Sequence, residues 1–427
     1  MGSAASSKRI ALVDVNNFYA SCETVFDPTL RGRSVVVLSN NDGCVVARSA
    51  EAKSAGIKMA QPWHQVAPSI QRRTQVFSSN YALYADMSNR VMTILGDLAP
   101  SQEVYSIDES FLDLTGIPNL ARHATGIGQR VGQWTGLSVC VGIGSTKTRA
   151  KLANYVAKKA PEYDGIFNLE DWTDHDQTAV LTRIPVGEVW GIGFRTQRRL
   201  TAMGIRTVAD LQSADPKHLR QLFGVVIERV VAELNGDACM DLEQAPPPKK
   251  QIRSSRSFGK PVTDLSSLKE AMLAFVSIAA EKLRRQGSLA STMQVFICTN
   301  VFKAEAPQYS TGYTLKLPYA MDDTVMLARF AIRTLEHLYK PGFEYKKAGV
   351  NLMNLTPREN TQFGLFTNDD AVQRADKLSG TMDAINQRFG REALCLGRLA
   401  GKRRWSMNQS RLSRSYTTNS KELILAR

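Results

Sequence analysis

Three acidic side chains are the residues of this sequence best suited to chemistry. Asp14 ends the apolar run RIALVDV (9–15), a pattern typical of a buried strand, and Asp108-Glu109 lies between two short apolar segments. Carboxylates that lie close together repel one another, and a divalent cation that takes oxygen ligands, such as Mg²⁺, stabilises them. Two such ions about 4 Å apart can hold the attacking and leaving oxygens of a phosphoryl transfer. The pattern predicts a metal site if the fold brings the three together; taken singly, Asp14 would cap a turn and Asp108-Glu109 would be a charged hairpin tip.

The elements that must position these carboxylates follow the order β-α-β-β-α-β, the split βαβ or ferredoxin-like arrangement. We expect strands over residues 9–15, 103–107, 110–114 and 137–143, and helices over 17–26, 81–98, 120–134 and 147–159. In this arrangement the first strand lies beside the second and third, so that Asp14 would face Asp108 and Glu109. The segment 26–80 interrupts the pattern, and we expect it to be an inserted subdomain with a strand over 34–38 and a short helix over 49–55.

The second half of the chain contains two further regions joined by a linker. Residues 181–236 have the pattern of short helices with tight glycine turns, and the stretch APPPKK (245–250) is typical of a stiff, solvated linker. Beyond it we expect a second α/β domain with helices over 267–286 and 323–338 and strands over 291–299, 312–317 and 346–355. From residue 356 the sequence is polar and is expected to be irregular, and its last 27 residues carry seven Lys or Arg against Glu422 alone.

The overall charge favours a polyanionic partner. The 427 residues carry a formal net charge of +14, which favours nucleic acid over a membrane surface. Six scattered cysteines without a CxxC pair indicate a reducing compartment rather than a disulfide framework or a zinc knuckle. No apolar run is long enough to span a bilayer, and residues 1–7 lack the apolar core of a signal peptide, so we expect no membrane association and a cytoplasmic location.

Several ordered motifs resemble those of the Y-family, translesion DNA polymerases. They are VDVNNFYASCE (13–23), YSIDESFLDLT (105–115), SVCVGIGSTKTRAKLANYVAK (138–158) and VWGIGFRTQRRLTAMGI (189–205). Within that family the match is closest to the UmuC-type subunit of bacterial polymerase V, through SNNDGCVVARSAEAKSAG (39–56), FSSNYALYADMSNRVM (77–92) and SRSFG (255–259). The resemblance runs from about residue 10 to the C-terminus.

The resemblance implies an α+β multidomain fold. It has a ferredoxin-like palm with inserted small fingers, a helical thumb with helix-hairpin-helix elements and a separate α/β little finger. The implied boundaries are palm 8–25 and 81–170, fingers 26–80, thumb 171–241, linker 242–253, little finger 254–355 and a C-terminal tail 356–427.

The resemblance also implies roles for the residues around the carboxylates. Asp14 and Asp108 would bridge two Mg²⁺ ions, Glu109 would complete the catalytic one, and the backbone carbonyl of Val15 would be a further ligand. Tyr19 falls at the steric gate, an aromatic ring against the sugar of the incoming nucleotide that leaves no room for a 2′-hydroxyl. An isolated tyrosine on a helix more often packs in a core, and the neighbouring Phe18 fits either role.

Basic residues are implied to bind the triphosphate of the nucleotide. Lys158 falls at the family's triphosphate-binding lysine, although a solvated helix lysine would look the same. In the fingers, other members carry the pattern Y-E-A-R, whereas this chain has Ala50-Glu51-Ala52-Lys53. The tyrosine contact is therefore absent, and Lys53, with Arg48, would supply the positive charge. A lysine offers a point charge where the arginine of the pattern would offer two parallel hydrogen bonds.

A glycine turn in the thumb is a candidate DNA contact. Gly191 and Gly193 precede a helix, where exposed backbone N–H groups can bind a phosphate without regard to sequence, and three arginines follow at Arg195, Arg198 and Arg199. The plain alternative is a glycine turn inside a small helical bundle.

A short peptide in the C-terminal tail is a candidate for docking on another protein. Its members Gln362, Phe363, Leu365 and Phe366 resemble the bacterial sliding-clamp-binding pentapeptide, usually Gln-Leu-x-Leu-Phe. A strand edge packed on its own domain is the alternative. For the basic end of the tail, a solvated disordered segment and a segment that contacts phosphate or a partner are both open.

Together these features predict template-directed, error-prone DNA synthesis that adds dNTPs to a primer 3′ end on primer-template DNA. The resemblance further implies SOS-type damage tolerance with a UmuD′-like dimer, a RecA filament and the sliding clamp as partners, at the nucleoid. A palm-type nucleotidyl cyclase would share the fold and the metals but would not need the hairpin turns, the clamp-like peptide or the charge. A DNA-binding accessory protein without catalysis would not need the carboxylates.

Overall fold

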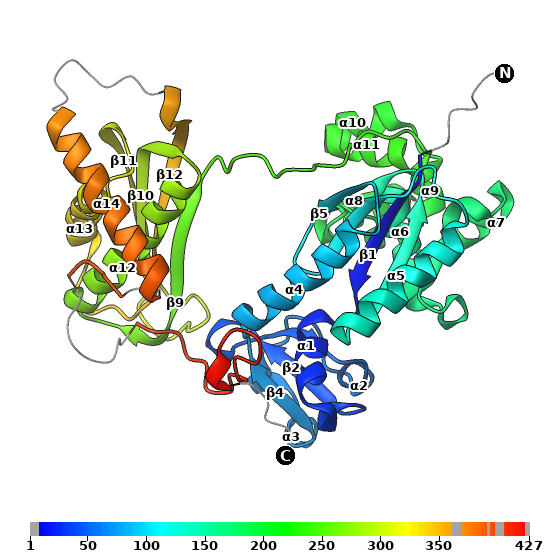
Figure 1. The fold of residues 1–427 in the computed structure, drawn as a ribbon, viewed down its shortest axis with the longest axis horizontal. Coiled ribbons are helices and arrows are strands. Elements are labelled where there is room, and N and C mark those ends of the chain that lie inside the picture. Colours follow the sequence, from blue (N-terminus) through cyan, green and yellow to red (C-terminus); the bar gives the residue numbers. More distant parts are fainter. Residues whose placement is uncertain (1–7, 361–368, 391–392, 398–404, 423–427) are drawn as a thin grey trace. The chain divides into compact units, whose positions relative to one another are not determined.

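The structure is a computed structural model that describes residues 8–360, 369–390, 393–397 and 405–422 (Figure 1). The chain divides into two compact units, which are described here one at a time. The first unit comprises Met1–Ser39, Cys44–Pro246 and Arg411–Arg427, and the second comprises Asn40–Gly43 and Pro247–Ser410.

A five-stranded sheet forms the centre of the first unit. Its order is β5-β6-β1-β7-β8, with the strands β1 (Ile10–Val15), β5 (Ser101–Val104), β6 (Glu109–Asp113), β7 (Val139–Gly144) and β8 (Ile166–Asn168). Strand β1 is antiparallel to both β6 and β7, which confirms the predicted ferredoxin-like order. The strand expected over 103–107 ends earlier, at Val104, because residues 105–108 turn back to bring the chain into β6.

Helices cover both faces of this sheet, which explains why every residue of β1 is buried. The helices are α4 (Tyr81–Gly96), α5 (Leu120–Thr135) and α6 (Lys147–Lys159). Alternate β1 residues Ala11, Val13 and Val15 share a core with α4 and α5, whereas Ile10 and Leu12 share a second core with Ala150 of α6. A buried strand at the centre of a sheet with helices on both sides has to be apolar throughout, as the run RIALVDV is.

A smaller three-stranded sheet is inserted before α4. Its order is β3-β2-β4, from β2 (Ser34–Leu38), β3 (Val45–Arg48) and β4 (Thr74–Ser78), with β4 parallel to β2. The helices of this region are α1 (Phe18–Phe26), α2 (Ala50–Ser54) and α3 (Pro68–Gln71). The inserted subdomain, its strand β2 and the short helix α2 were expected, but β3 and β4 were not, because each is only four or five residues long and lies among turn-forming residues.

A bundle of short helices follows the five-stranded sheet. Its helices are α7 (Asp174–Leu181), α8 (Phe194–Ala202), α9 (Val208–Gln212), α10 (Pro216–Phe223) and α11 (Val225–Leu234), in agreement with the predicted short helices. The turns before α9 and α11 contain Gly204 and Gly224 with φ of 91° and 86°, a backbone conformation that favours glycine. This confirms tight glycine turns between the helices.

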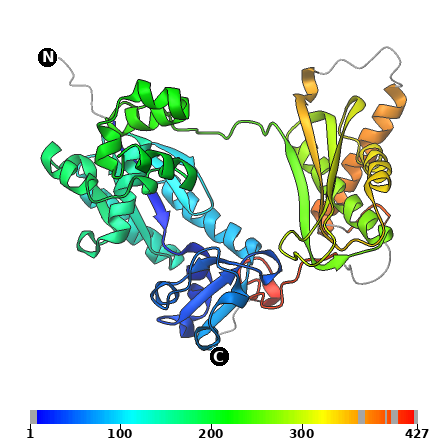
Figure 2. The same cartoon turned by 180° about the vertical axis from the view of Figure 1, so that it is seen from behind.

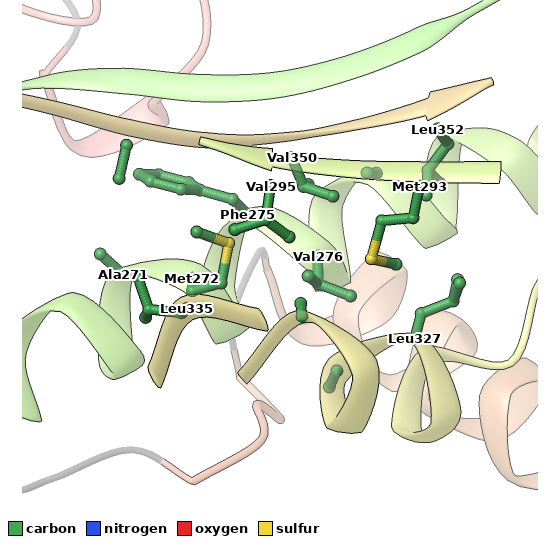
Figure 3. Packing of buried hydrophobic residues seen from close by; sticks show 14 of the residues in the cluster. Ala271, Met272, Phe275, Val276, Met293, Val295, Leu327, Leu335, Val350 and Leu352 are labelled. Carbon is green, nitrogen blue, oxygen red and sulfur yellow. The ribbon is translucent and has the colours of Figure 1, made fainter. Parts of the chain in front are cut away.

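The second unit is built on a four-stranded antiparallel sheet in the order β11-β10-β12-β9. Its strands are β9 (Ile252–Val262), β10 (Ser288–Thr299), β11 (Ser310–Met321) and β12 (Tyr345–Pro357), and the helices α12 (Leu265–Arg285) and α13 (Thr324–Leu338) lie on one face (Figures 1 and 2). Figure 3 shows side chains of the sheet, such as Val295 and Val350, meeting Met272 and Phe275 of α12. The predicted helices and three strands are confirmed. Strand β9 was not expected, and it begins two residues inside the stretch 242–253 that was expected to be linker.

A long helix, α14 (Asp369–Phe389), corrects the expectation that the chain is irregular from residue 356 onward. Arg284 of α12 donates from Nε and Nη2 to the two oxygens of Asp383, each at 2.7 Å, and Arg358 donates from Nη2 to Asp376 at 2.5 Å. These ion pairs hold α14 against the rest of the second unit. Its polar composition concealed it, because few apolar residues mark its buried side.

The basic C-terminal end makes specific contacts in each unit, although many of its described side chains are exposed. In the second unit Trp405 is only 1% exposed and lies edge-on to Phe275, with ring centroids 5.7 Å apart. In the first unit residues 411–422, which we call the C-terminal strap, lie beside β4 (Figures 1 and 2). Of the two alternatives left open for the basic end, the solvated, disordered segment is therefore excluded for these residues.

Among the described residues, the structure contains no helix of sufficient length and apolarity to cross a membrane.

Candidate active site

The C-terminal end of β1 brings the three predicted carboxylates together. Asp14 is the direct antiparallel partner of Glu109 on β6, so their side chains lie on the same face of the sheet. The backbone N–H of Val15 donates to the carbonyl of Asp108 at 2.9 Å, which fixes the turn between β5 and β6 against the end of β1. Residues almost a hundred positions apart in the sequence thus form one acidic edge.

The face that carries the carboxylates is the face that α6 covers, and α6 turns a row of lysines toward it. Lys158 Nζ lies 2.5 Å from Asp14 Oδ2, and Lys151 Nζ lies 2.9 Å from Glu109 Oε1. The two lysines are seven residues, or about two turns, apart and so lie on one side of the helix. Asp108 accepts instead a hydrogen bond from the hydroxyl of Ser106 at 2.7 Å.

The electrostatics of Asp14 reflect its neighbours. Asp14 is only 8% exposed, and this burial raises the pKa of its carboxyl group to about 6. Lys158 opposes this rise, whereas the nearby charges of Glu109 and Asp108 add to it. A cation near Asp14 therefore stabilises the ionised form.

The carboxylates Asp14, Asp108 and Glu109 do not form a ready-made metal site in this structure. Among the residues that the structure describes, no three His, Cys, Asp or Glu side chains are grouped so that they could hold a metal ion. The physical reason is that two of the three carboxylates point to lysines of α6 and the third to a serine. The donor set itself, three carboxylates and a backbone carbonyl at one sheet edge, consists of the hard oxygen ligands that Mg²⁺ requires.

Lys151 is a site residue that the sequence did not point out. Besides Glu109, its ammonium group lies 4.4 Å from the ring centroid of Tyr105, 5.4 Å from that of Trp190 and 5.8 Å from that of Phe111. The indole N–H of Trp190 donates to the hydroxyl of Tyr105 at 3.1 Å, so the turn before α8 is tied to the same cluster. The seven-residue spacing from Lys158 was the signal that would have found it.

Tyr19, the expected steric gate, is held by other aromatic rings. It stacks on Tyr84 of α4, with centroids 4.4 Å apart and an interplanar angle of 14°, and meets Tyr81 edge-on at 6.2 Å. Its own ring is partly exposed. Phe18 is only 3% exposed and belongs to the core shared by α1, α4 and the sheet, which favours a packing role for that residue.

The predicted triphosphate cations gather near one another. Lys53 Nζ donates to Asn17 Oδ1 at 2.5 Å, and burial, followed by the positive charges of Arg48, Lys158 and Lys159, lowers its pKa. Arg48 donates from Nη1 to the carbonyl of Ile57 at 2.5 Å, while its buried Nε has no partner among the described residues. An anion beside Lys53 would favour its charged form.

The glycine turn before α8 has open backbone. Gly191 has φ of 88°, and Gly193 occupies the N-cap of α8 without a side-chain cap. Arg195, Arg198 and Arg199 are all exposed beside it, and Arg199 in addition donates to the carbonyl of Leu222 at 3.0 Å. A similar turn at Gly224 before α11 was missed, although the sequence FGVV has the same glycine-before-helix pattern.

The clamp-like peptide, with Gln362, Phe363, Leu365 and Phe366, lies outside the described residues.

Models of one protein family match both halves of the chain. The model described as the impB/mucB/samB family matches residues 13–155, and the model of that family's C-terminal domain matches residues 249–365. Protein ImpB of Salmonella typhimurium is 43% identical, over 98% of this chain and 99% of its own length. The chain belongs to the impB/mucB/samB family. A further model, a domain of unknown function, matches residues 376–426 of this family member.

Other relatives place the family among the DNA polymerases. Protein UmuC of Salmonella typhimurium (strain LT2) is 42% identical over 97% of this chain and 99% of its own length. DNA polymerase IV of Pelotomaculum thermopropionicum is 27% identical over 90% of this chain and 94% of its own length. A solved Y-family polymerase chimera of Dbh and Dpo4 has the same fold, with a TM-score of 0.63 at 22% identity over 81% of this chain and 99% of that one. The chain is thus a UmuC-like DNA polymerase with the fold of the Y family, as its motifs predicted.

Proposed function

We propose that this polymerase carries out template-directed, error-prone translesion synthesis, adding dNTPs to a primer 3′ end as part of SOS-type damage tolerance. The observation that carries the proposal is the acidic edge of β1 and β6, where Asp14 pairs with Glu109 beside Asp108. An edge of this kind, with Lys53 and Lys158 nearby, suits a reaction between a polyphosphate and a hydroxyl group.

In the proposed reaction Asp14, Asp108, Glu109 and the carbonyl of Val15 would hold two Mg²⁺ ions. When bound, such ions favour deprotonation of the primer 3′-hydroxyl and neutralise the charge of the departing pyrophosphate. The chain's own residues bind and orient the reactants. Asp14, with a pKa raised to about 6 by burial, is mostly ionised at pH 7.5 and available as a ligand.

The basic residues and the aromatic gate would act on the nucleotide. Lys158, Lys53 and Arg48 would neutralise its triphosphate. Burial, followed by the charges of Arg48 and Lys158, lowers the pKa of Lys53, so an anion beside it would be favourable. Tyr19, stacked on Tyr84, would place its ring against the sugar and exclude a 2′-hydroxyl. Phe18, buried in the core, would support the helix that carries the gate.

The thumb and the overall charge would hold the DNA. Backbone N–H groups at the turn of Gly191 and Gly193 would bind phosphate, with Arg195 and Arg198 exposed beside it. This form of binding reads no bases, as a polymerase requires. The name of the UmuC relative favours a UmuD′-like dimer as a partner. The motif resemblance adds a RecA filament and, through residues 362–366, the sliding clamp.

Primer extension tests the proposal. We expect dNTP incorporation with Mg²⁺ on undamaged and abasic templates, tested with and without the three partners, and a loss of roughly a thousandfold in Asp108→Asn. Asp97→Asn, which removes an exposed carboxylate at the end of α4, is the matched control and should extend normally.

Three results would contradict the proposal. Full extension by Asp108→Asn would indicate that the carboxylates are not catalytic. Arrest at an abasic site as complete as that of a replicative polymerase would exclude lesion bypass. Formation of cyclic nucleotides without a template would indicate a cyclase instead.

A further inference from the structure

The C-terminal strap is docked on the first unit at several points. The backbone N–H of Ser78, at the end of β4, donates to the carbonyl of Arg411 at 2.9 Å, and the N–H of Arg411 donates to Ser78 Oγ at 3.0 Å. Tyr416 stacks on Phe26 of α1, with centroids 4.9 Å apart and an interplanar angle of 7°. Within the strap, Glu422 accepts the N–H of Ser415 at 2.7 Å. The strap is therefore an ordered element rather than a loose tail.

A second group of contacts fixes the strap to the start of α4. The side-chain amide of Asn80, the N-cap of α4, donates to Ser413 Oγ at 3.0 Å and to the carbonyl of Arg414 at 3.2 Å. The carbonyl oxygen of the same side chain accepts the N–H of Leu83 at 3.3 Å. One asparagine thus caps the helix and binds the strap.

Ser413 reaches a buried carboxylate. Glu23 of α1 is 1% exposed, and its Oε1 accepts hydrogen bonds from Ser413 Oγ at 3.1 Å and from the hydroxyl of Tyr84 at 2.6 Å. Both donors are neutral hydroxyl groups. A buried carboxylate is costly unless its oxygens are hydrogen-bonded, so loss of either donor would disturb the whole group.

The same tyrosine supports the gate. The ring of Tyr84 is fully buried and stacks on the ring of Tyr19 at 4.4 Å. The contacts therefore run without a break from Ser413 through Glu23 and Tyr84 to Tyr19. Each member is in direct contact with the next.

We propose that the C-terminal strap is a positioning element for sugar selection by the polymerase: Ser413 orients Glu23, Glu23 orients Tyr84, and the Tyr84 ring holds the gate ring of Tyr19. This inference rests on the proposed role of Tyr19 as steric gate. It gives a role to part of residues 376–426, which match the model of a domain of unknown function.

The experiment measures discrimination between dNTPs and rNTPs by the full-length chain, as the ratio of kcat/KM for the two. Ser413→Ala removes one donor to Glu23, and Tyr84→Phe keeps the stacked ring but removes the other. We expect each to lower the discrimination roughly three- to tenfold, the effect of one hydrogen bond, while dNTP extension changes less. Ser420→Ala, an exposed serine of the same strap, is the matched control and should not change the ratio.

A double-mutant cycle identifies the route of the effect. In a Tyr19→Ala background, where the gate is absent, Ser413→Ala should have no further effect on discrimination. An additive effect would show that the strap acts elsewhere. Thermal unfolding of each variant separates a purely structural role, since a variant with a lower Tm and unchanged discrimination would overturn the inference.

The two levels of the proposal fail in different ways. If Tyr19→Ala leaves discrimination unchanged, the gate assignment is wrong. If Tyr19→Ala lowers it and neither Ser413→Ala nor Tyr84→Phe does, the gate stands and the role of the strap is wrong.

Discussion

At the scale of single residues, the site is a set of carboxylates each matched with a specific donor. Lys158 faces Asp14, Lys151 faces Glu109, and a hydroxyl faces Asp108. The carboxylates were predictable because acidic residues that interrupt apolar strands are conspicuous. Lys151 was missed, although its seven-residue spacing from Lys158 places the two lysines on one side of the helix, and the aromatic rings around it are visible only in the packed structure.

The two lysines of α6 are expected to affect different kinetic constants. Lys151→Leu removes the charge beside Glu109 but keeps an apolar side chain among the rings, so kcat should fall roughly ten- to a hundredfold with little change in KM for dNTP. Lys158→Ala should raise that KM roughly tenfold, because the proposed contact is with the triphosphate. Steady-state kinetics on one template distinguish them, and equal changes in both constants for both variants would contradict the assignment.

Glu23 makes stability depend on pH. Burial raises its pKa from 4.5 to about 7, so the folded chain binds this proton more tightly than the unfolded chain does. Stability from this group is therefore fully present below about pH 4.5 and is lost as the pH rises through 7. Between pH 8 and pH 6 the free energy of unfolding should rise by about 1 kcal/mol from this residue.

Urea unfolding at the two pH values checks this effect. Glu23→Gln cannot titrate, so its unfolding free energy should lack that increment. An identical pH dependence in the two proteins would show that Glu23 is not the group responsible.

At the scale of elements, the sheet edge depends on how closely α6 approaches β7. A Cβ on Gly142 would lie 2.0 Å from the backbone nitrogen of Asn154, and one on Gly144 would lie 2.7 Å from that of Ala150. Both contacts are with backbone, which has little freedom to move. The glycines of the VGIG motif thus allow α6 to lie flat on the sheet and bring its lysines to the carboxylates.

Gly142→Ala is therefore expected to destabilise the fold by roughly 3 kcal/mol or more, as overpacking against a rigid backbone does. Gly126→Ala is the control, because a Cβ there meets nothing within 4 Å on α5 and alanine favours a helix. Chemical unfolding of both variants checks the contrast. Equal stability of Gly142→Ala and the unaltered chain would mean that α6 does not pack as closely as described.

How far the sequence predicts the elements depends on how much local pattern each one carries. Strand β2 and helix α6 were predicted with their observed limits because both have clear periodicity and flanking turn signals. Strand β9 was missed because Ser, Arg, Gly and Pro interrupt its few apolar residues, and its pairing with β12 supplies the order that its sequence lacks. The contact between Glu23 and Ser413 joins residues 390 positions apart, and no local pattern marks it.

At the scale of the whole molecule, the net charge of +14 is the property most directly linked to DNA. Exposed cations contribute to binding through phosphate, whereas those tied into the protein contribute less. The three arginines of α8 are all exposed, but Arg199 is tied into the bundle, since it donates to the carbonyl of Leu222 and lies 4.3 Å from the ring centroid of Phe223.

DNA affinity should consequently fall steeply as the salt concentration rises. Single substitutions should show which of the arginines contribute to this salt dependence. Arg195→Ala and Arg198→Ala should each lower the slope of log K against log salt by roughly one unit, the effect of one phosphate contact. Arg199→Ala should leave the slope nearly unchanged and lower the stability of the helical bundle. Fluorescence anisotropy with a primer-template duplex over a range of salt concentrations measures the slopes, and three equal slopes would contradict the distinction.

The docked end of the chain also bears on what a shortened gene would produce. A premature stop codon at Arg411 would leave Asp14, Asp108 and Glu109 encoded and would remove Ser413 from Glu23. If Tyr19 is the steric gate and the strap positions it, as we propose, the truncated chain would still extend primers but would leave more ribonucleotides embedded in the new strand. Cleavage of that strand by alkali or by a ribonuclease specific for such embedded residues would then reveal the missing terminus.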